Sequence, residues 1–341
     1  MRCPGCLTDK DDDGFCKKCL KELFNGKKVS PVLPFDPPFK EESGLYTEFA
    51  KTMSISGVQI KYLLRLEGGN LNLTQQAGQY ILKPVPSGPF KNLDQAPANE
   101  HLTMQIARQV FKISAPANAV IHFKDGSPAY LVKRFDVKLA SAKRSGEAMQ
   151  DGQGVKYQQE DFAQIAQLSE ETHGKDYKYD MSYEEVGNLI KQHIATHQVE
   201  MEKFFRLMLF NYTFSNGDAH VKNFSAIRSD TGDYILTPAY DLLCTKLHSP
   251  GENDMALTLF KEGFSEAYQA IGFYTYFDFL QLGEKLGIRE ARTIRIIDEF
   301  RNDRNEISDL IEKSFLRREI KDLYKEYYKD RVKRLKMEWK K

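Results

Sequence analysis

The chain has 341 residues, which at about 150 residues per domain suggests roughly two domains. Hydrophobic residues make up 41% and charged residues 28%, so the composition excludes a disordered chain, a collagen and a coiled coil. The net charge of +1 gives no reason to expect a polyanionic partner. No run approaches the roughly 18 apolar residues of a membrane span, and no apolar signal core begins the chain. We therefore expect a cytoplasmic protein with no membrane partner.

Four of the five cysteines lie within the first nineteen residues, in two Cys-x-x-Cys pairs. Each pair can point two thiolates at one ion, and two pairs complete a tetrahedral zinc site. Two disulfides are the alternative, which the absence of a signal peptide disfavours. Four thiolates leave no open position, so the zinc would be structural and would let this short segment fold. We predict a zinc ribbon over residues 1–28, with the ligands Cys3, Cys6, Cys16 and Cys19.

Four prolines between residues 31 and 38 predict an extended linker over residues 29–45. The next segment, 46–157, is predicted to form strands over 62–66, 79–83 and 129–135, with one helix over 98–111. The remainder, 158–341, is predicted to be mainly helical, with helices over 183–197, 200–214 and from about 277 onward. A strand-rich lobe followed by a helical lobe is an α+β architecture with a cleft between the lobes.

The residue types that carry chemistry concentrate between 216 and 224. Asp218 and Asn223 have the spacing of a kinase catalytic loop, in which the carboxylate orients a hydroxyl nucleophile and the amide oxygen binds magnesium. Lys222 can neutralise charge on a transferred phosphoryl group. Asp241 follows a short strand predicted over 234–238, where a second magnesium ligand belongs. A helix N-cap is the structural alternative for Asp241.

The strand-rich lobe offers two features that would suit a nucleotide. Lys83 ends a predicted strand and Glu100 follows on a helix, the order of the ion pair that positions nucleotide phosphates. A solvated strand-end lysine is the alternative. Residues 54–61 precede the first strong strand, and the small residues around Gly57 would let backbone N–H groups approach phosphate oxygens. With one glycine, this loop matches a glycine-rich loop only weakly.

These segments, in this order, resemble the kinase core of the HipA family, bacterial Ser/Thr kinases that act as toxins in toxin–antitoxin pairs. The resemblance runs from about residue 46 to 310 and is carried by 54–61, 81–83, 99–100, 133–136, 159–161, 217–225 and 236–241. It implies a two-lobed protein-kinase-like fold, Asp218 as the catalytic acceptor, and Mg²⁺ held by Asn223 and Asp241. It also implies that 133–135 forms the hinge against adenine. The ATP-binding residues assigned on this basis are Ser56, Gly57, Val58, Gln59, Lys61, Lys83, Lys133, Arg134, Phe135, His220, Asn223, Tyr240 and Asp241.

The resemblance further implies control by autophosphorylation. Ser54 matches the phosphorylated serine by its place in the first loop, and Ser56 is a second candidate because the Ser-Ile-Ser form resembles the short HipT-type members. A phosphoserine brings about two negative charges toward the ATP phosphates, and this repulsion would open the loop. For either serine, a plain small loop residue is the alternative.

The resemblance also implies partners. These are a protein substrate, with translation factors such as aminoacyl-tRNA synthetases as candidates, and a HipB-like DNA-binding antitoxin. The ribbon and linker stand where longer members carry an N-terminal subdomain, which the short members have as a separate protein, so a small HipS-like subunit is a further expected partner.

Two other functions are alternatives to a protein kinase. The first is a catalytically silent HipA-like module that contacts an antitoxin or DNA through the ribbon and the basic segment 314–341, which holds eleven Lys or Arg against five acids. The presence of Asp218, Asn223 and Asp241 together argues against it. The second, a small-molecule kinase related to aminoglycoside phosphotransferases, is not supported by the first loop or by the form of 236–241.

Overall fold

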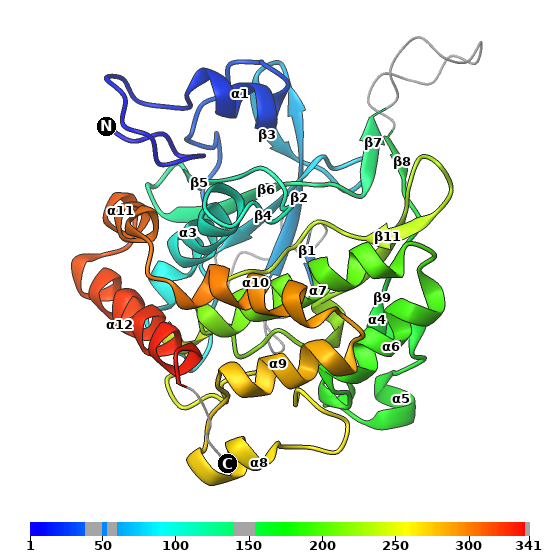
Figure 1. Ribbon diagram of the computed structural model, residues 1–341. Helices are drawn as coiled ribbons and strands as arrows, with labels where there is room; N and C mark the ends of the chain where they lie inside the picture. The colour runs from blue at the N-terminus through cyan, green and yellow to red at the C-terminus, as the bar shows by residue number, and fades with distance from the viewer. Residues whose placement is uncertain (38–49, 53–59, 140–153, 338–341) are drawn as a thin grey trace.

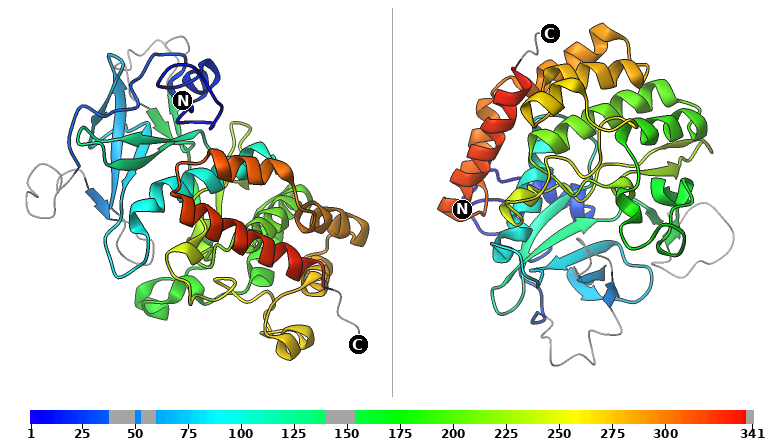
Figure 2. Two further views of the ribbon diagram at one scale, coloured as in Figure 1. Left: turned by 90° about the vertical axis from the view of Figure 1, so that its left-hand side faces the viewer. Right: turned by 90° about the horizontal axis from the view of Figure 1, so that it is seen from below.

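The computed structural model describes residues 1–37, 50–52, 60–139 and 154–337. Ser54, Ser56, Gly57, Val58 and Gln59 lie outside this range. Figures 1 and 2 show a strand-rich lobe and a helical lobe, with helix α3 (Ala96–Gln109) between them and helix α1 (Lys17–Phe24) on the outer side of the sheet. This arrangement is the predicted two-lobed α+β architecture.

Within the described residues, one antiparallel sheet of six strands forms the strand-rich lobe, in the order β1-β2-β4-β6-β5 with β3 also paired to β2. Two smaller sheets join β7 to β8 and β11 to β10 to β9. The strands are β1 (Ala50–Thr52), β2 (Ile60–Glu67), β3 (Asn70–Leu73), β4 (Tyr80–Pro84), β5 (Asn118–His122), β6 (Pro128–Lys133), β7 (Val137–Leu139), β8 (Gly154–Lys156), β9 (Gln159–Asp161), β10 (Ser225–Arg228) and β11 (Tyr234–Leu236).

The two faces of the large sheet have different partners, because successive side chains of a strand point to opposite faces. Leu82 pairs with Leu131 across β4 and β6, and both belong to a core that includes Leu23 and Phe24 of α1. Lys83 pairs with Tyr130 on the opposite face, where Tyr130 joins the core of the helical lobe. One face therefore carries the ribbon, and the other faces α3 and the cleft.

Helix α3 lies in the strand-rich half of the sequence but packs into the core of the helical lobe. Its residues Leu102 and Ile106 are fully buried in the same cluster as Phe205 and Leu209 of helix α7. The other helices are α4 (Phe162–Ile165), α5 (Glu170–His173), α6 (Tyr183–His193), α7 (His197–Thr213), α8 (Glu266–Ile271), α9 (Tyr276–Lys285), α10 (Glu290–Arg301), α11 (Asn305–Lys313) and α12 (Arg318–Leu335). Short 3-10 turns are η1 (Leu93–Gln95), η2 (Tyr177–Tyr179), η3 (Val221–Asn223) and η4 (Thr245–Leu247).

The predicted elements agree with the observed ones to within a few residues. The helix expected over 98–111 covers 96–109, and those expected over 183–197 and 200–214 cover 183–193 and 197–213. The strand expected over 234–238 ends at Leu236. None of the described helices has the length and apolarity that a membrane span requires.

The described part of the predicted linker, residues 29–37, runs beside β5. Leu33 is buried and its N–H donates to the carbonyl of His122 at 2.8 Å, and the N–H of His122 donates to the carbonyl of Pro31 at 2.9 Å. The chain is non-helical there, as the prolines predict. The domain boundaries drawn from the sequence remain predictions.

Helix α12 carries most of the basic segment 314–341, and part of its charge is buried. Arg331 is 1% exposed, with its guanidinium 2.6 Å from the Asp254 carboxylate, and Arg334 binds the other oxygen of the same carboxylate at 2.7 Å. Part of the positive charge of this helix is therefore paired inside the helical lobe.

We predict that Phe111→Ala destabilises the whole chain. The Phe111 ring follows α3 and stacks on Phe300 of α10 with centroids 4.5 Å apart, and it also meets Phe210 and Phe214. Removing a buried ring leaves a cavity and costs about 3–5 kcal/mol. Urea unfolding measures the loss. The control is Val199→Ala, which is 60% exposed and should change stability by less than about 0.5 kcal/mol. Equal small effects in the two variants would contradict this packing.

Candidate active site

Lys83 lies at the centre of the site, buried between two carboxylates. Its Nζ is 2.6 Å from Oε1 of Glu100 on α3 and 2.5 Å from Oδ1 of Asp241, which follows β11. Both Lys83 and Glu100 are 3% exposed. Tyr130 of β6 lies beneath the ammonium, with its ring centroid 5.5 Å from Nζ. The predicted Lys83–Glu100 pair is therefore present, and the alternative of a solvated strand-end lysine is wrong.

A second cation, Lys61, reaches the same carboxylate. It lies on β2, on the sheet face that carries Lys83, and its Nζ is 3.6 Å from Oδ2 of Asp241. Burial favours the neutral acid, but Lys61 and Lys83 outweigh burial and hold the pKa of Asp241 well below its ordinary value. Two basic and two acidic groups therefore meet in this buried cluster, where burial lowers the pKa of Lys61 and raises that of Glu100.

The backbone at Asp241 is in the left-handed region, with φ of +53°. Non-glycine residues adopt this conformation at a cost and are common at functional sites. The chain continues as a loop to η4, so Asp241 is not a helix N-cap. Instead the unusual backbone directs the carboxylate to Lys83, and the Asp241 carbonyl accepts from the Nδ2 of Asn216 at 3.3 Å. This bond links Asp241 to the loop that carries Asp218.

Asp218 and Lys222 each contact a tyrosine of η2. The Tyr179 hydroxyl donates to Oδ1 of Asp218 at 2.6 Å, and Lys222 Nζ donates to the Tyr177 hydroxyl at 3.0 Å. Burial and the Asp218 carboxylate raise the pKa of Tyr179 well above its ordinary value, which keeps its hydroxyl protonated. Neither tyrosine is predicted from its sequence context, because nothing local in the sequence shows that η2 meets the catalytic loop.

The rest of the catalytic loop is held by hydrogen bonds. The side-chain oxygen of Asn223 accepts from the backbone N–H of His220 at 3.1 Å. The Tyr240 hydroxyl donates to the carbonyl of Lys222 at 2.8 Å and lies 2.6 Å from the Ser225 hydroxyl. Burial lowers the pKa of His220 to about 4, so its ring is neutral at physiological pH. The Tyr240 hydroxyl supports the catalytic loop by its hydrogen bond to the backbone carbonyl of Lys222.

The predicted hinge residues are only partly brought to the site. Phe135 lies with its ring 6.0 Å from that of Tyr240. Arg134 pairs with Asp136 at 2.6 Å. Lys133 points away, because it shares the sheet face of Leu131 and donates to the carbonyl of Glu22 in α1 at 2.8 Å.

A cavity of about 480 Å³ opens beside Asp218. Its walls come from the connection between β4 and α3, from Tyr179, and from the segment between Leu243 and Ala256. Much of the lining is apolar, and Asp218 and Glu252 supply its carboxylates. The lining residues are Pro86, Ser87, Phe90, Leu93, Ala96, Tyr179, Gly217, Asp218, Leu243, Thr245, His248, Ser249, Gly251, Glu252, Asn253, Met255 and Ala256.

Glu252 was not anticipated from the sequence. Its Oε1 lies 2.5 Å from the Thr245 hydroxyl, whose oxygen accepts the N–H of Gly217 at 2.7 Å. Burial raises the pKa of Glu252 to about 7. A Cβ on Gly217 would lie 2.6 Å from the Asn253 carbonyl oxygen, so only glycine allows the catalytic loop to approach this wall so closely.

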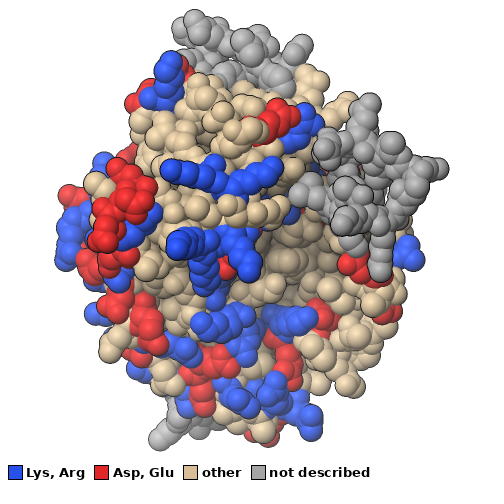
Figure 3. All heavy atoms as spheres, turned by 90° about the horizontal axis from the view of Figure 1, so that it is seen from above, with Lys and Arg blue, Asp and Glu red and all other residues tan. Residues whose placement is uncertain are grey.

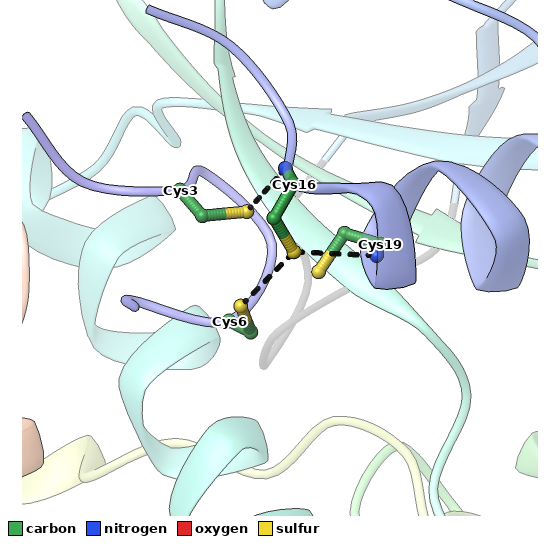
Figure 4. A group of neighbouring side chains, drawn as sticks. All are labelled: Cys3, Cys6, Cys16 and Cys19. Atoms are coloured by element: carbon green, nitrogen blue, oxygen red, sulfur yellow. Dashed lines mark hydrogen bonds between the residues drawn. The ribbon is translucent and has the colours of Figure 1, made fainter. Parts of the chain in front are cut away.

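The four N-terminal cysteines form a compact cluster away from the cleft (Figure 4). Their sulfurs all lie within 4.8 Å of one another, and those of Cys6 and Cys16 are 3.6 Å apart. A disulfide would need about 2.05 Å, whereas tetrahedral zinc with bonds of about 2.3 Å separates its sulfurs by roughly 3.8 Å. The geometry therefore fits a four-coordinate metal ion and not two disulfides.

A comparison with protein families matches residues 53–306 to the HipA-like C-terminal domain. A relative from Haemophilus influenzae, named "Putative kinase", is 26% identical over 333 residues and covers 94% of this chain and 92% of its own. A relative from Sinorhizobium fredii, named "Putative kinase Y4dM", is 28% identical over 256 residues, which are 70% of this chain and 56% of the relative.

Two solved structures share the fold. A complex of Shewanella oneidensis HipA, HipB and operator DNA matches with a TM-score of 0.58 and 20% identity, over 82% of this chain and 63% of that one. CtkA, a proinflammatory kinase of Helicobacter pylori, matches with a TM-score of 0.51 and 14% identity, over 81% and 90%. These matches confirm the predicted HipA-type fold. The chain spans 56% of the Sinorhizobium relative and 63% of the Shewanella chain.

We predict that Glu252 makes the chain less stable as pH rises. Its folded pKa of about 7 lies above the ordinary value of 4.5, so folding favours the protonated acid. Stability from this group is complete below about pH 4.5 and is lost as pH rises through about 7. Melting temperatures from pH 5 to pH 8 should fall less for Glu252→Gln than for the wild type. Parallel profiles would contradict the raised pKa.

Proposed function

The chain belongs to the family of HipA-like C-terminal domains, and we propose that it is a Mg²⁺–ATP-dependent kinase that phosphorylates serine or threonine hydroxyls of a protein. The observation that carries the proposal is the placement of Asp218 beside an open cavity, on a loop that Asn216 bonds to Asp241 in the buried cluster of Lys83, Glu100 and Asp241. Phosphoryl transfer requires little covalent chemistry from a protein. It depends on positioning and on neutralising charge.

The cluster around Lys83 suits nucleotide phosphates. Lys61 and Lys83 lie on the same sheet face and direct two ammonium groups to one point, where Asp241 is ionised. Asp241 and Asn223 offer the oxygen atoms that magnesium prefers. When bound, the ion would neutralise charge on the phosphates. In this proposal Asp241 and Asn223 hold the ion, while Glu100 keeps the Lys83 ammonium directed into the cleft.

Asp218 would orient the acceptor hydroxyl and take its proton. The hydrogen bond from Tyr179 supports this role, because a tyrosine hydroxyl already donates to Asp218 as an acceptor hydroxyl must. The cavity that reaches the carboxylate is also lined by Phe90 and Met255. Lys222 would neutralise charge that develops during transfer. The apolar lining favours acceptors that lie beside apolar side chains of the substrate.

The proposal extends to the biological setting that the family resemblance implies. The chain would act as a toxin on a protein substrate such as an aminoacyl-tRNA synthetase, with a HipB-like antitoxin and a HipS-like subunit as partners. The solved Shewanella complex, which contains HipA, HipB and operator DNA, supports the antitoxin partner. Zinc is proposed as the structural ion of the four cysteines, whose spacing fits it.

Asp218→Asn is predicted to abolish phosphoryl transfer and to leave ATP affinity nearly unchanged. The amide keeps the size of the side chain but cannot accept a proton, and Asp218 lies outside the Lys83 cluster. Incorporation of labelled phosphate and calorimetric titration with Mg²⁺–ATP measure the two properties. Asp309→Asn, an exposed change of the same chemistry on α11, is the control. Transfer at the wild-type rate by Asp218→Asn would refute the assignment.

Autophosphorylation of the first loop is predicted to require the same residue. Phosphatase-treated protein should gain one or two phosphates with Mg²⁺–ATP, at Ser54 or Ser56, and Asp218→Asn should gain none. Intact-mass spectrometry followed by peptide mapping checks both. No gain on the wild-type protein would favour the alternative of a silent module that binds an antitoxin or DNA.

A further inference from the structure

The first 28 residues, the ribbon, lie directly against α3, the helix that carries Glu100. His101, the next residue on that helix, is fully buried, and its Nε2 is 3.2 Å from the carbonyl oxygen of Gly5. A carbonyl oxygen only accepts, so Nε2 is the donor. Gly5 lies between Cys3 and Cys6. One turn of α3 therefore contacts two regions. Its Glu100 carboxylate pairs with the Lys83 ammonium, and its His101 ring bonds the carbonyl of Gly5 within the first cysteine pair.

Further bonds extend this contact along the helix and onto the sheet. The side-chain amide of Gln109, near the end of α3, donates to the carbonyl of Cys6 at 3.0 Å, and Arg108 pairs with Glu22 of α1 at 2.8 Å. The N–H of Val120 in β5 donates to the carbonyl of Pro4 at 3.1 Å. The backbone carbonyls of Pro4, Gly5 and Cys6 thus accept hydrogen bonds from α3 and β5. These bonds fix the position of the helix relative to the sheet.

The ribbon also contacts the helical lobe. The Arg2 guanidinium donates to the carbonyl of Glu312 at 3.2 Å, and Asp9 pairs with Lys313 at 3.1 Å. Leu7 is buried in the core of that lobe, together with Leu102 of α3. Figure 1 shows the N-terminal segment beside α11. The ribbon therefore bridges both lobes at the helix between them.

The path of the first cysteine pair depends on the second pair. A Cβ on Gly5 would lie 2.8 Å from the sulfur of Cys19, so the two pairs pack as closely as glycine allows. By itself a segment of this size has too little core to hold such a path, so the path depends on a metal ion as well as on the cores that Leu7, Leu23 and Phe24 join. The carbonyls of Pro4, Gly5 and Cys6 would then lose their positions if the four sulfurs were not held together.

We propose that the four cysteines hold a zinc ion whose binding keeps α3 in place, so that metal in the ribbon maintains the contact between Glu100 and Lys83. The ATP-binding consequence rests on the proposed kinase function, whereas the metal and the position of α3 do not.

The outer face of the ribbon, which does not contact α3, is positively charged. Its exposed lysines are Lys17, Lys18, Lys21, Lys27 and Lys28, and Figure 3 shows Lys and Arg side chains gathered on this side of the molecule.

The first test measures metal content and helix stability. Elemental analysis of the purified chain should give stoichiometric zinc. Removal of zinc with a chelator under reducing conditions should increase hydrogen exchange of the amides of 96–109 by about tenfold or more, while α10 changes little. Mg²⁺–ATP affinity should fall about tenfold, within the usual range for coupled sites.

A variant that leaves the cysteines intact keeps the proposal testable if the zinc-free chain unfolds. His101→Leu removes the donor to Gly5 and should retain zinc while increasing exchange in α3. His101→Gln, which keeps a donor, should restore part of the protection. Lys17→Ala, on the exposed outer face, is the matched control and should leave zinc, exchange and ATP affinity unchanged.

Three results would overturn the proposal: no zinc in the purified chain, unchanged exchange in α3 after zinc is removed, or wild-type exchange in His101→Leu. Absence of ATP binding in the zinc-loaded wild type would refute the kinase function alone, because the exchange measurements do not depend on it.

Discussion

The buried ammonium of Lys83 is the constraint on which the arrangement of the lobes depends. A charge that is 3% exposed is very costly without partners. Its two partners come from α3 and from the loop after β11, which lie in different parts of the chain. Because neither lobe contains all three groups, the charge is neutralised only when the sheet, α3 and the catalytic lobe meet in one geometry. The cleft is therefore defined by an electrostatic requirement as well as by packing.

Much of the fold could be predicted because the apolar periodicity of its elements is local. The spacing of Asp218, Asn223 and Asp241 predicts a catalytic site, and the structure brings Asp241 to Lys83. Strand alternation places the Lys133 side chain on the face of Leu131, which α1 covers. A motif comparison shows that a lysine is present but not which side of the sheet it occupies.

The residues that could not be predicted act across long sequence distances. Tyr179 reaches Asp218 across 39 positions, and Glu252 becomes a buried acid only because the segment after β11 folds back on Gly217. The four cysteines indicated a metal site by spacing alone, but their spacing gave no sign that the intervening carbonyls bond α3. Local patterns thus predict the helices, strands and motifs, whereas the contacts between distant segments are known only from the structure.

The contact between Arg2 and Glu312 spans 310 residues of sequence, and this separation affects how the chain matures. On the ribosome, the cysteine pairs leave the exit tunnel long before the corner between α11 and α12 is made. Contacts so distant in sequence form late, because closing a large loop costs entropy before any contact rewards it. A preformed ribbon would be a template for the nascent sheet. Its contacts with Glu312 and Lys313 form only when nearly all of these residues have been translated.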